Sequence, residues 1–462
     1  MLKNAAILLL ASALAALLWR DLHKPGAPPQ GVASPLNPVE KLIQDHAGQP
    51  GFAGSAIGFC LLDPDGRVVA SQNPQGALIP ASSLKTVTTA TALEKWGPDH
   101  RIETRLTATA EILNGVIVGD LVVVGGGDPM LSLQDLREWA GQLQKRGLKR
   151  VTGRVLGDGR LFPGSIYDDF WNWGDIGNGY GSPVSGLNLE HNRYIVAFRA
   201  AEQVGGPTIL LGMVPEVPGV IWTNETQTGA MDSGDGVVIH GGERTGVLHF
   251  RGTVPLGQSA FQVTGAVPDP ERYAAHHLKQ ALLEAGIEVA GAAEAVKDRA
   301  AGKVELLRHA SPPLRDIITS IHATSDNHET ECLFRLLGLR ESKAAEKVIR
   351  EHWKGRGLDF SSLRMEDGCG LARADFITPH DLARLQFLAS TGPQCTVYKA
   401  SLLQQGPLRW KGGAMSGVRS VTGIVTTAAG REMWFALMVN HYADAGEVAA
   451  LREALVEQIS RW

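Results

Sequence analysis

The sequence predicts an α+β protein with more than one domain, and three observations support this. With 462 residues, and roughly 100–200 residues per domain, the chain is long enough for two to four domains with cores of their own. Residues 101–305 are rich in valine, glycine and short strand-like runs and contain few long helical patterns. Apolar runs separated by short turns, near both ends of the chain, predict antiparallel strands. Together these patterns favour a helix-and-sheet domain interrupted by an insert.

The first 22 residues are predicted to be an export signal or a membrane anchor. Lys3 is followed by an apolar run of 15 residues, from Ala5 to Trp19. At about 1.5 Å per residue this run would span about 22 Å as a helix, less than the ~30 Å of a hydrocarbon core. An export signal is therefore expected, with an uncleaved anchor as the alternative, and export would place the protein in the periplasm or elsewhere outside the cytoplasm. Residues 23–38 are rich in proline and predict a linker.

Beyond the linker, the pattern predicts a short helix over Pro38–His46 and then a β-hairpin. Its strands are expected at Ser55–Asp63 and Arg67–Gln72, because both runs are apolar and the Asp63–Gly66 segment between them has the composition of a tight turn.

Ser82 and Lys85 lie at the start of the next predicted helix. Pro80 and Ala81 break the chain, and a helical pattern follows over Ser83–Trp96. Residues three apart share a face of a helix, so the Lys85 amine can lie beside the Ser82 hydroxyl and act as the base that a serine nucleophile needs. The helix N-terminus would also favour negative charge on that oxygen. Taken alone, however, S-x-x-K is common in proteins without any catalytic role.

A second polar group, Ser325-Asp326-Asn327, is predicted to lie between helices at Leu314–Ala323 and Thr330–Leu339. On such a connection Ser325 could pass a proton and Asn327 could hold a substrate amide. The same residue types are ordinary turn and capping residues, so this group alone is also consistent with a structural role.

A third group begins at Lys411, which is predicted to open or lie on a strand of an antiparallel sheet. Strands at Ser420–Thr427 and Met433–Asn440 follow it, joined by a turn over Ala428–Arg431. A strand lysine beside a reactive serine can bind a carboxylate, although an isolated strand lysine is most often a solvated surface residue.

S-x-x-K, S-D-N and a K-T-G-like triad in this order form the set found in penicillin-binding proteins and class A β-lactamases. Over about residues 40–460 the chain resembles the D-alanyl-D-alanine carboxypeptidase/endopeptidase family of low-molecular-mass class C penicillin-binding proteins, peptidase family S13. Further segments that carry the resemblance are Gly125–Pro129, Gly157-Asp158 with Leu161-Phe162, His309–Leu314 and Asp367–Leu371.

The resemblance implies a penicillin-recognising, transpeptidase-like domain, an antiparallel sheet flanked by helices, with nested and mainly β insert domains. The 243 residues between Ser82 and Ser325 leave room for them. The implied division is a catalytic domain over 39–100 and 306–462, an inserted domain II over 101–190 and 268–305, and an inserted domain III over 191–267.

The implied activity is that of a serine DD-peptidase. In this mechanism Ser82 attacks the carbonyl between two D-alanines and forms an acyl-enzyme, while Lys85 takes the serine proton. Ser325 would carry a proton to the leaving amine, Asn327 would orient the peptide, and Lys411 would receive the terminal carboxylate.

Further binding roles are implied for the residues around the third motif. Backbone N–H groups of Ser82 and Ala414 would form the oxyanion hole. The rest of the substrate-binding run would be Gly412, Gly413, Met415 and Ser416. For Asp158 the resemblance suggests contact with a free amine of the peptidoglycan side chain, and an ordinary strand-end aspartate is the alternative.

The implied partners are peptidoglycan stem peptides and β-lactam antibiotics. A net charge of −4 gives no electrostatic reason to expect nucleic acid. Four cysteines without a C-x-x-C spacing indicate no zinc site, and no metal or cofactor is expected, although one or two disulfides remain possible. Membrane association is expected only through the N-terminal segment.

Gly412 departs from the family pattern, which has a hydroxyl residue at the middle of the third motif. The missing hydrogen bond to a carboxylate is worth about 1.5–3 kcal/mol, so binding could weaken roughly tenfold to a hundredfold unless Ser416, a water or another donor replaces it. A catalytically weak or lapsed peptidoglycan-binding relative is therefore one alternative, and a β-lactamase or esterase of the same fold is another. Cys369 stands where serine is commoner in the family and is expected to pack as a small buried residue.

Overall fold

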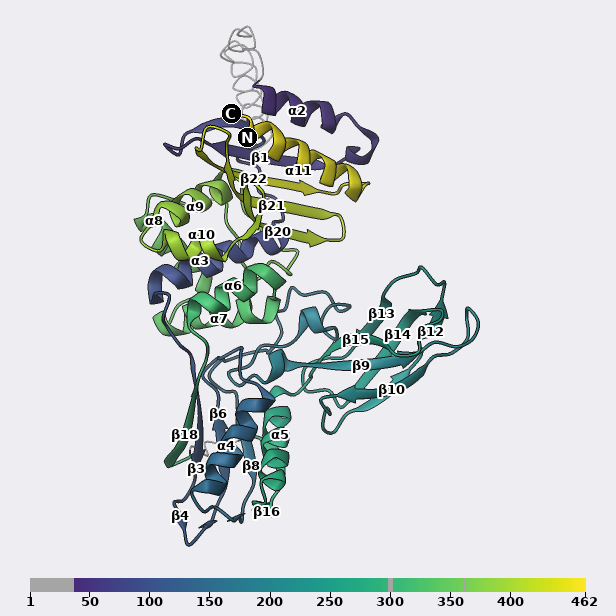
Figure 1. Cartoon of the computed structure of the whole chain (residues 1–462), viewed down its shortest axis with the longest axis vertical. Coiled ribbons are helices and arrows are strands. Elements are labelled where there is room, and N and C mark those ends of the chain that lie inside the picture. Colours follow the sequence, from purple (N-terminus) through teal and green to yellow (C-terminus); the bar gives the residue numbers. More distant parts are fainter. Residues whose placement is uncertain (1–36, 298–301, 361) are drawn as a thin grey trace, which may run out of the picture.

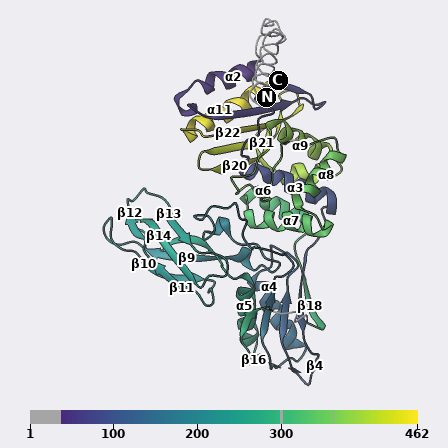
Figure 2. The ribbon, with the colours of Figure 1, turned by 180° about the vertical axis from the view of Figure 1, so that it is seen from behind.

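The computed structural model describes residues 37–297, 302–360 and 362–462 (Figure 1). The predicted signal or anchor of residues 1–22, and the predicted linker up to residue 36, lie outside these residues. In the part of the chain that is described, no helix is long and apolar enough to cross a membrane. One domain holds both ends of the described chain, and two inserts extend from it (Figures 1 and 2).

A six-stranded antiparallel sheet, in the order β19-β20-β21-β22-β1-β2, forms one half of this first domain. Its central strands β21 and β22 are buried along nearly their whole length, because helices cover both faces of the sheet. For that reason β22 is a continuous apolar run from Met433 to Val439 rather than an alternating one. Helices α2 and α11 cover one face. The bounds are α2 Pro38–Ala47, β1 Ala56–Leu62, β2 Val68–Gln72, β19 Leu403–Gln405, β20 Leu408–Met415, β21 Val418–Thr426, β22 Glu432–Asn440 and α11 Ala445–Ser460.

The other face of the sheet is covered by a group of helices built around α3. This helix contacts α6, α7, α8 and α9 and is buried on all sides over its first three quarters. Its threonines tolerate this burial because their hydroxyls are bonded, as in Thr88, which donates to the Gly368 carbonyl at 2.7 Å. The helices predicted over 83–96, 314–323 and 330–339 are present. The bounds are η2 Ala81–Leu84, α3 Lys85–Trp96, α6 Leu314–Thr324, α7 Asn327–Glu341, α8 Ala345–Gly355, α9 Pro379–Thr391 and α10 Cys395–Ser401.

The first insert contains a mixed five-stranded sheet in the order β17-β8-β6-β3-β18, with helices α4 and α5 packed together against it. Among its described residues, this insert therefore combines two helices with nine strands, within the predicted α+β class. β18 pairs with β3 as far as Ala310, so the sheet extends beyond residue 305, where the sequence placed its end. The bounds are β3 Glu103–Ala108, β6 Leu121–Val124, α4 Leu133–Lys145, β8 Val155–Asp158, α5 Pro270–Glu284, β17 Ala293–Ala295 and β18 Val304–Ala310, and the short strands β4 Ile112–Leu113, β5 Val116–Ile117, β7 Arg150–Val151 and β16 Glu288–Val289 form a small second sheet.

The second insert is an all-β unit that projects sideways from the first (Figure 1). It holds a three-stranded sheet, β10-β9-β15, and a four-stranded sheet in which β14 pairs with β11, β12 and β13. Both inserts share one hydrophobic core, which includes Leu106, Tyr194 and Phe250. The bounds are β9 Arg193–Arg199, β10 Ile209–Val214, β11 Ile221–Asn224, β12 Gln227–Gly229, β13 Gly236–His240, β14 Val247–Pro255 and β15 Phe261–Ala266.

Candidate active site

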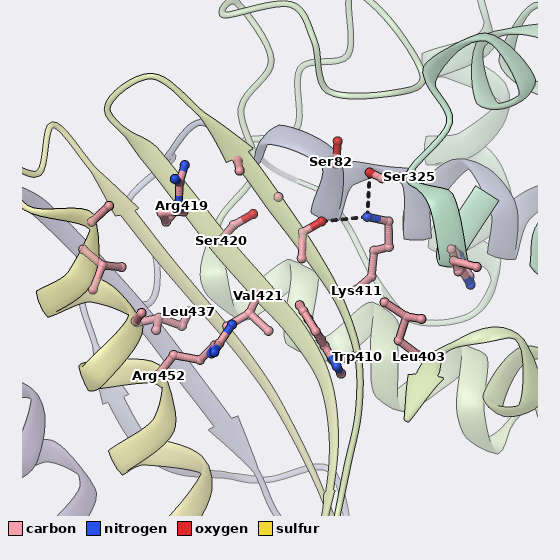
Figure 3. A pocket seen from close by; sticks show the side chains of 18 residues that line it. Ser82, Ser325, Leu403, Trp410, Lys411, Arg419, Ser420, Val421, Leu437 and Arg452 are labelled. Carbon is pink, nitrogen blue, oxygen red and sulfur yellow. Dashed lines mark hydrogen bonds between the residues drawn. The ribbon is translucent and has the colours of Figure 1, made fainter. Parts of the chain in front are cut away.

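Ser82 lies in the 3-10 turn η2, directly before α3. The residue ahead of it, Ala81, is buried and has a left-handed backbone conformation with φ 47°, which an L-residue adopts at a cost. The backbone therefore changes direction directly before Ser82, and α3 begins three residues later at Lys85. Ser82 is half-buried and lines a cavity of about 420 Å³ (Figure 3).

Lys85 is fully buried beneath Ser82. Its Nζ atom lies 2.8 Å from Ser82 Oγ, 2.6 Å from Asn327 Oδ1 and 2.6 Å from the Cys369 carbonyl oxygen. Burial lowers the pKa of the Lys85 amine, although nearby acidic groups such as Asp367 act in the opposite direction. A lysine with a lowered pKa that touches a serine hydroxyl can serve as its base.

Ser325 and Asn327 flank the junction of two helices. Ser325 ends α6 in a left-handed conformation, Asp326 caps α7 by accepting from the Glu329 N–H at 2.8 Å, and Asn327 is the first residue of α7. Asn327 thus belongs to the helix and not to the connection. Its side chain is held at both ends, because Oδ1 accepts from Lys85 and Nδ2 donates to the Tyr180 carbonyl at 2.8 Å.

Lys411 reaches Ser325 from strand β20. Its Nζ donates to Ser325 Oγ at 2.8 Å and to the Gly412 carbonyl at 2.7 Å (Figure 3). Burial, together with the like charge of Lys85, lowers the pKa of Lys411 to about 7. The structure therefore gathers the five residues in two hydrogen-bonded groups. Ser82, Lys85 and Asn327 form one group, and Ser325 and Lys411 form the other. Ser82, Ser325 and Lys411 line the same cavity.

Strand β20 passes close to Ser82 at Gly413. A Cβ atom at this glycine would lie 2.7 Å from Ser82 N and 2.7 Å from the Pro80 carbonyl oxygen, so only glycine permits this approach. The Ser420 hydroxyl, opposite Gly413 on β21, donates to the same Pro80 carbonyl. Gly413 and Ala414 both line the cavity with Ser82, as an oxyanion hole built from backbone N–H groups would require.

Gly412 also lines the cavity, and it offers no hydroxyl at the position where the family pattern has one. A Cβ atom here would lie 2.6 Å from the Trp410 ring, so any side chain at this position requires the indole to move. Met415 and Ser416 do not line the cavity: Met415 ends the strand, and the carbonyl of exposed Ser416 accepts from Arg373 at 3.0 Å. Ser416 therefore does not replace the missing hydroxyl.

Asp158 does not line the cavity, so the structure does not bring it together with the five motif residues. Its carboxylate accepts hydrogen bonds from the Arg160 guanidinium at 2.8 Å and 2.7 Å. Burial acts to raise the pKa of Asp158, but these bonds hold the pKa below its ordinary value. The carboxylate is thus engaged at the end of β8 and lies outside the cavity lining.

A different aspartate, Asp175, lies next to the site and was missed from the sequence. Its Oδ1 accepts from the Tyr180 hydroxyl at 3.0 Å and its Oδ2 accepts from Asn172 at 2.8 Å, and the carbonyl of the same Tyr180 receives Asn327 Nδ2. Asp175 lies in the 159–178 segment, which contains no helix or strand. A long irregular segment in a compact domain is commonly functional, and that was the available signal.

Cys369 contributes its backbone to the site and not its thiol. The carbonyl accepts from Lys85, while burial raises the pKa of the thiol well above its ordinary value. All four cysteines are free. The backbone here is fixed by Asp367, which accepts from four successive N–H groups and from Trp171 Nε1 at 2.7 Å.

Among the described residues, two groups of side chains have the spacing of metal ligands. In each group a carboxylate is already bonded to an arginine. One joins Glu331, Asp367 and Cys369, and the other joins His191, Asp326 and Glu329. Glu331 accepts from Arg335 at 3.0 Å, and Asp326 accepts from Arg193 at 2.6 Å. These contacts are those of structural ion pairs.

The buried His322 also borders the cavity. Burial and the charge of Lys411 lower its pKa to about 3, so His322 is neutral near pH 7 and too weakly basic to accept the Ser82 proton.

Comparison with known proteins agrees with this geometry. The sequence model of the D-Ala-D-Ala carboxypeptidase 3 (S13) family matches residues 39–461. A D-alanyl-D-alanine carboxypeptidase from Actinomadura sp. (strain R39) is 25% identical over 92% of this chain and 84% of its own length, and the carboxypeptidase DacB of Haemophilus influenzae is 24% identical over 88% and 90%. The crystal structure of penicillin binding protein 4 from Haemophilus influenzae superposes with a TM-score of 0.82 at 20% identity, over 92% of this chain and all of that one. A second structure of that protein, complexed with a β-lactam, gives a TM-score of 0.75.

Proposed function

The chain belongs to the D-Ala-D-Ala carboxypeptidase 3 (S13) family, and on this premise we propose that Ser82 is the nucleophile acylated by the substrate. The observation that carries the proposal is the 2.8 Å contact between Ser82 Oγ and the fully buried Lys85 Nζ. A weakly nucleophilic serine needs a base at this distance, and a desolvated amine supplies one.

The reaction proceeds by acyl transfer. Ser82 Oγ bonds to the carbonyl carbon of the penultimate D-alanine as its proton passes to Lys85. The N–H groups of Ser82 and Ala414 stabilise the oxyanion, a contribution of about 2.7–4 kcal/mol per donor in other hydrolases. The C–N bond then breaks, Ser325 delivers the proton to the leaving amine, and water releases the acyl group from Ser82.

The proposed substrates are peptidoglycan stem peptides. The Lys411 ammonium, which is bonded to Ser325 and lines the cavity with Ser82, would receive the carboxylate next to the scissile bond. Asp175 would receive a free amine of the stem peptide, since its carboxylate is partly exposed and is linked through Tyr180 to Asn327. β-Lactams, one of which is bound in the structure of the Haemophilus influenzae relative, would acylate Ser82 as substrate analogues.

Defined muropeptides test the proposal and the choice between carboxypeptidase and endopeptidase activity. Purified protein is incubated with a pentapeptide monomer and with a cross-linked dimer, and the products are weighed by mass spectrometry. Loss of one alanine from the monomer, or conversion of the dimer to monomers, is expected with wild type and absent with Ser82→Ala. Intact substrates after prolonged incubation with wild-type protein would contradict the proposal.

A second candidate function is that of a catalytically weak or lapsed protein that binds peptidoglycan. One observation favours it, namely that Gly412 lacks the side chain that the family pattern has. In that case fluorescent penicillin would label Ser82 slowly or not at all, and the muropeptides would bind without being cleaved. Fast labelling followed by rapid release of hydrolysed drug would instead indicate a β-lactamase.

We also propose that the protein acts outside the cytoplasm, because Lys3 and the apolar run to Trp19 have the pattern of an export signal. Cell fractionation with mass determination of the mature N-terminus tests this. A protein found in the cytoplasm with residue 1 still present would contradict it.

A further inference from the structure

The cavity beside Ser82 continues past Gly412 to the other face of strand β20. Its lining includes Ser82 and Lys411 on the catalytic side and, beyond Gly412, residues of β21, β22 and the first turns of α11. Across β20 and β21, Gly412 pairs with Val421 and Ala414 pairs with Arg419. Paired residues project from the same face of a sheet, so Arg419 stands on the face where Gly412 leaves a gap.

This second part of the cavity has apolar walls and cationic ends. The walls are formed by Trp410, Val421, Leu437, Val448 and Ala449, and the guanidinium groups of Arg419 and Arg452 border it (Figure 3). Among the described residues that line the whole cavity, Lys411, Arg419 and Arg452 are cationic and none is a carboxylate. Such a chamber favours an aliphatic group that ends in an anion.

Within the part of the chain that the structure describes, no buried acid pairs with either guanidinium. Arg452 lies over the Trp410 ring, 5.6 Å from its centroid, and it pairs with Glu453, which is 72% exposed. Arg419 donates to the carbonyls of Met415 and Val418 at 3.3 Å and 3.2 Å. Both groups therefore keep donors for an incoming carboxylate.

We propose that this region, bordered by Gly412, Trp410, Arg419 and Arg452, is a subsite for the leaving residue of the substrate, and that it takes a D-amino acid whose aliphatic side chain ends in a carboxylate. This inference rests on the proposed function. The leaving residue would lie between Ala414, which is beside the acylated carbonyl, and Lys411, which holds the α-carboxylate of that residue. Gly412 lies between Ala414 and Lys411 on strand β20. The methyl group of a leaving D-alanine is too short to reach the guanidinium groups past Gly412.

The missing side chain at position 412 is what connects the two parts. A Cβ atom there would lie 2.6 Å from the Trp410 ring, so a threonine would fill the passage or displace the indole. The loss of one hydroxyl ligand and the gain of a longer subsite are thus two consequences of one residue.

Three synthetic peptides, identical up to the penultimate D-alanine, test the proposal. They end in D-alanine, D-norleucine or D-2-aminopimelate, and release of the last residue is measured as kcat and KM. The expected wild-type order of kcat/KM is D-2-aminopimelate, then D-norleucine, then D-alanine, with at least about a tenfold span, because charge-assisted hydrogen bonds add to apolar burial.

Arginine variants assign the preference to this chamber. Arg452→Gln and Arg419→Gln are expected to reduce the ratio between the D-2-aminopimelate and D-norleucine peptides toward one, mainly through a higher KM. Arg461→Gln, on an exposed arginine at the end of the same helix α11 whose partner is Glu457, is the matched control and is expected to keep the wild-type ratio.

Equal kcat/KM for the three peptides in wild type would overturn the inference, as would a preference that both variants retain. If a variant does not fold, as judged by loss of fluorescent-penicillin labelling, the wild-type order and a Gly412→Thr variant, in which the preference should disappear, decide the question. Failure of the proposed function looks different: no residue is released from any peptide and no label is bound.

Discussion

At the scale of single residues, the site depends on two buried amines whose pKa values are both lowered. Lys85 is fully buried and Lys411 is nearly so, and each is joined to a serine hydroxyl at 2.8 Å. Burial is the main cause of both lowered pKa values, and repulsion from Lys85 adds to the shift at Lys411. Because the two amines interact, the pair titrates jointly, and one neutral amine beside one charged amine is the state suited to the reaction.

This pairing predicts a bell-shaped pH profile for acylation by a penicillin. The rate constant should rise as the pair of amines loses its first proton and fall as the pair loses its second, because the second loss removes the charge that holds the carboxylate. In Lys411→Arg the side chain stays charged up to high pH, so the alkaline fall should disappear or move up by several pH units. The measurement is the second-order acylation rate from pH 5 to 10. An alkaline limb at the same pH in the variant would contradict this assignment.

Asp175 gives a second prediction at this scale. Asp175→Asn should lower kcat/KM for stem peptides with a free amine by about tenfold to a hundredfold, the worth of one charge-assisted hydrogen bond. Acylation by a penicillin without an amine should be unchanged. Asp158→Asn is the matched control and should have no effect on either reaction. Equal losses in the two variants would show that Asp175 has no special role.

The sequence could predict the five motif residues of the site because each belongs to a motif with a mechanism. They are Ser82, Lys85, Ser325, Asn327 and Lys411. Asp175 could not be predicted in this way, since its link to the site runs through a backbone carbonyl, that of Tyr180, in a segment without periodicity. The sequence also could not decide between the two roles considered for Asp158. A conspicuous Gly-Asp pair after a strand says nothing about the neighbour, Arg160, that occupies the carboxylate.

At the scale of elements, the junction between α6 and α7 is held by the inserts. Residues Glu190, His191 and Asn192 all have positive φ, and they place His191 against Glu329 at 2.9 Å and Arg193 against Asp326 at 2.6 Å. Ser325 and Asn327 flank that aspartate. The inserts therefore fix the position of the second motif relative to Ser82.

Breaking one of these ion pairs should destabilise the protein in a pH-dependent way. Burial acts to raise the pKa of Asp326, but the charge of Arg193 holds that pKa well below its ordinary value. The ion pair therefore contributes stability above about pH 4, and this stability is lost as the pH falls through the lowered pKa. Arg193→Met should lower the free energy of unfolding at pH 7 by about 1–3 kcal/mol, because it leaves a buried carboxylate unpaired.

Urea denaturation at pH 7 and pH 3 measures this effect. The difference between wild type and Arg193→Met should narrow at pH 3. Arg251→Met, which breaks the exposed pair with Glu225, should change stability by less than about 1 kcal/mol at both pH values. A difference for Arg193→Met that stays constant with pH would contradict the assignment to Asp326.

Most elements of the first domain could be predicted from sequence because their periodicity is set by burial on one or both faces. The start of α7 was placed three residues too late, at residue 330, since the cap that starts it, Asp326, is itself part of the second motif. The packing of helices α4 and α5 on one sheet could not be predicted from local patterns, because it brings together segments more than a hundred residues apart.

At the scale of the whole molecule, Trp171 is one of the side chains that join the inserts to the first domain. Trp171 is buried in a small cluster with Cys369, Leu371 and Ala372, and its Nε1 donates to Asp367. Asp367 in turn holds the turn that presents the Cys369 carbonyl to Lys85. The position of the insert and the environment of the base are thus linked.

Trp171→Ala is expected to lower the free energy of unfolding by about 3–5 kcal/mol, the usual cost of removing a large buried aromatic side chain, and to slow acylation of Ser82. Trp171→Phe keeps most of the packing and loses the hydrogen bond, so it should have a smaller effect on both. Thermal unfolding and penicillin acylation rates are the measurements. A Trp171→Ala protein with a lower melting temperature but a wild-type acylation rate would show that the contact is structural only.

The nesting of the inserts could be expected from the family resemblance but not from local patterns. Strand β18 returns to β3 after nearly two hundred residues, and no local rule indicates which strands pair at such a distance. The same holds for the chamber beyond Gly412, which appears only when β20, β21 and α11 are brought together.

The most direct test of the central claim, that Ser82 is the acylated nucleophile of this cleft, is mass spectrometry of the protein after incubation with benzylpenicillin. A single adduct of the mass of the intact drug is expected, located by proteolysis on the peptide that contains Ser82, absent in Ser82→Ala and strongly reduced in Lys85→Met. An adduct on another residue, or no adduct in wild type that is folded by circular dichroism, would contradict the account.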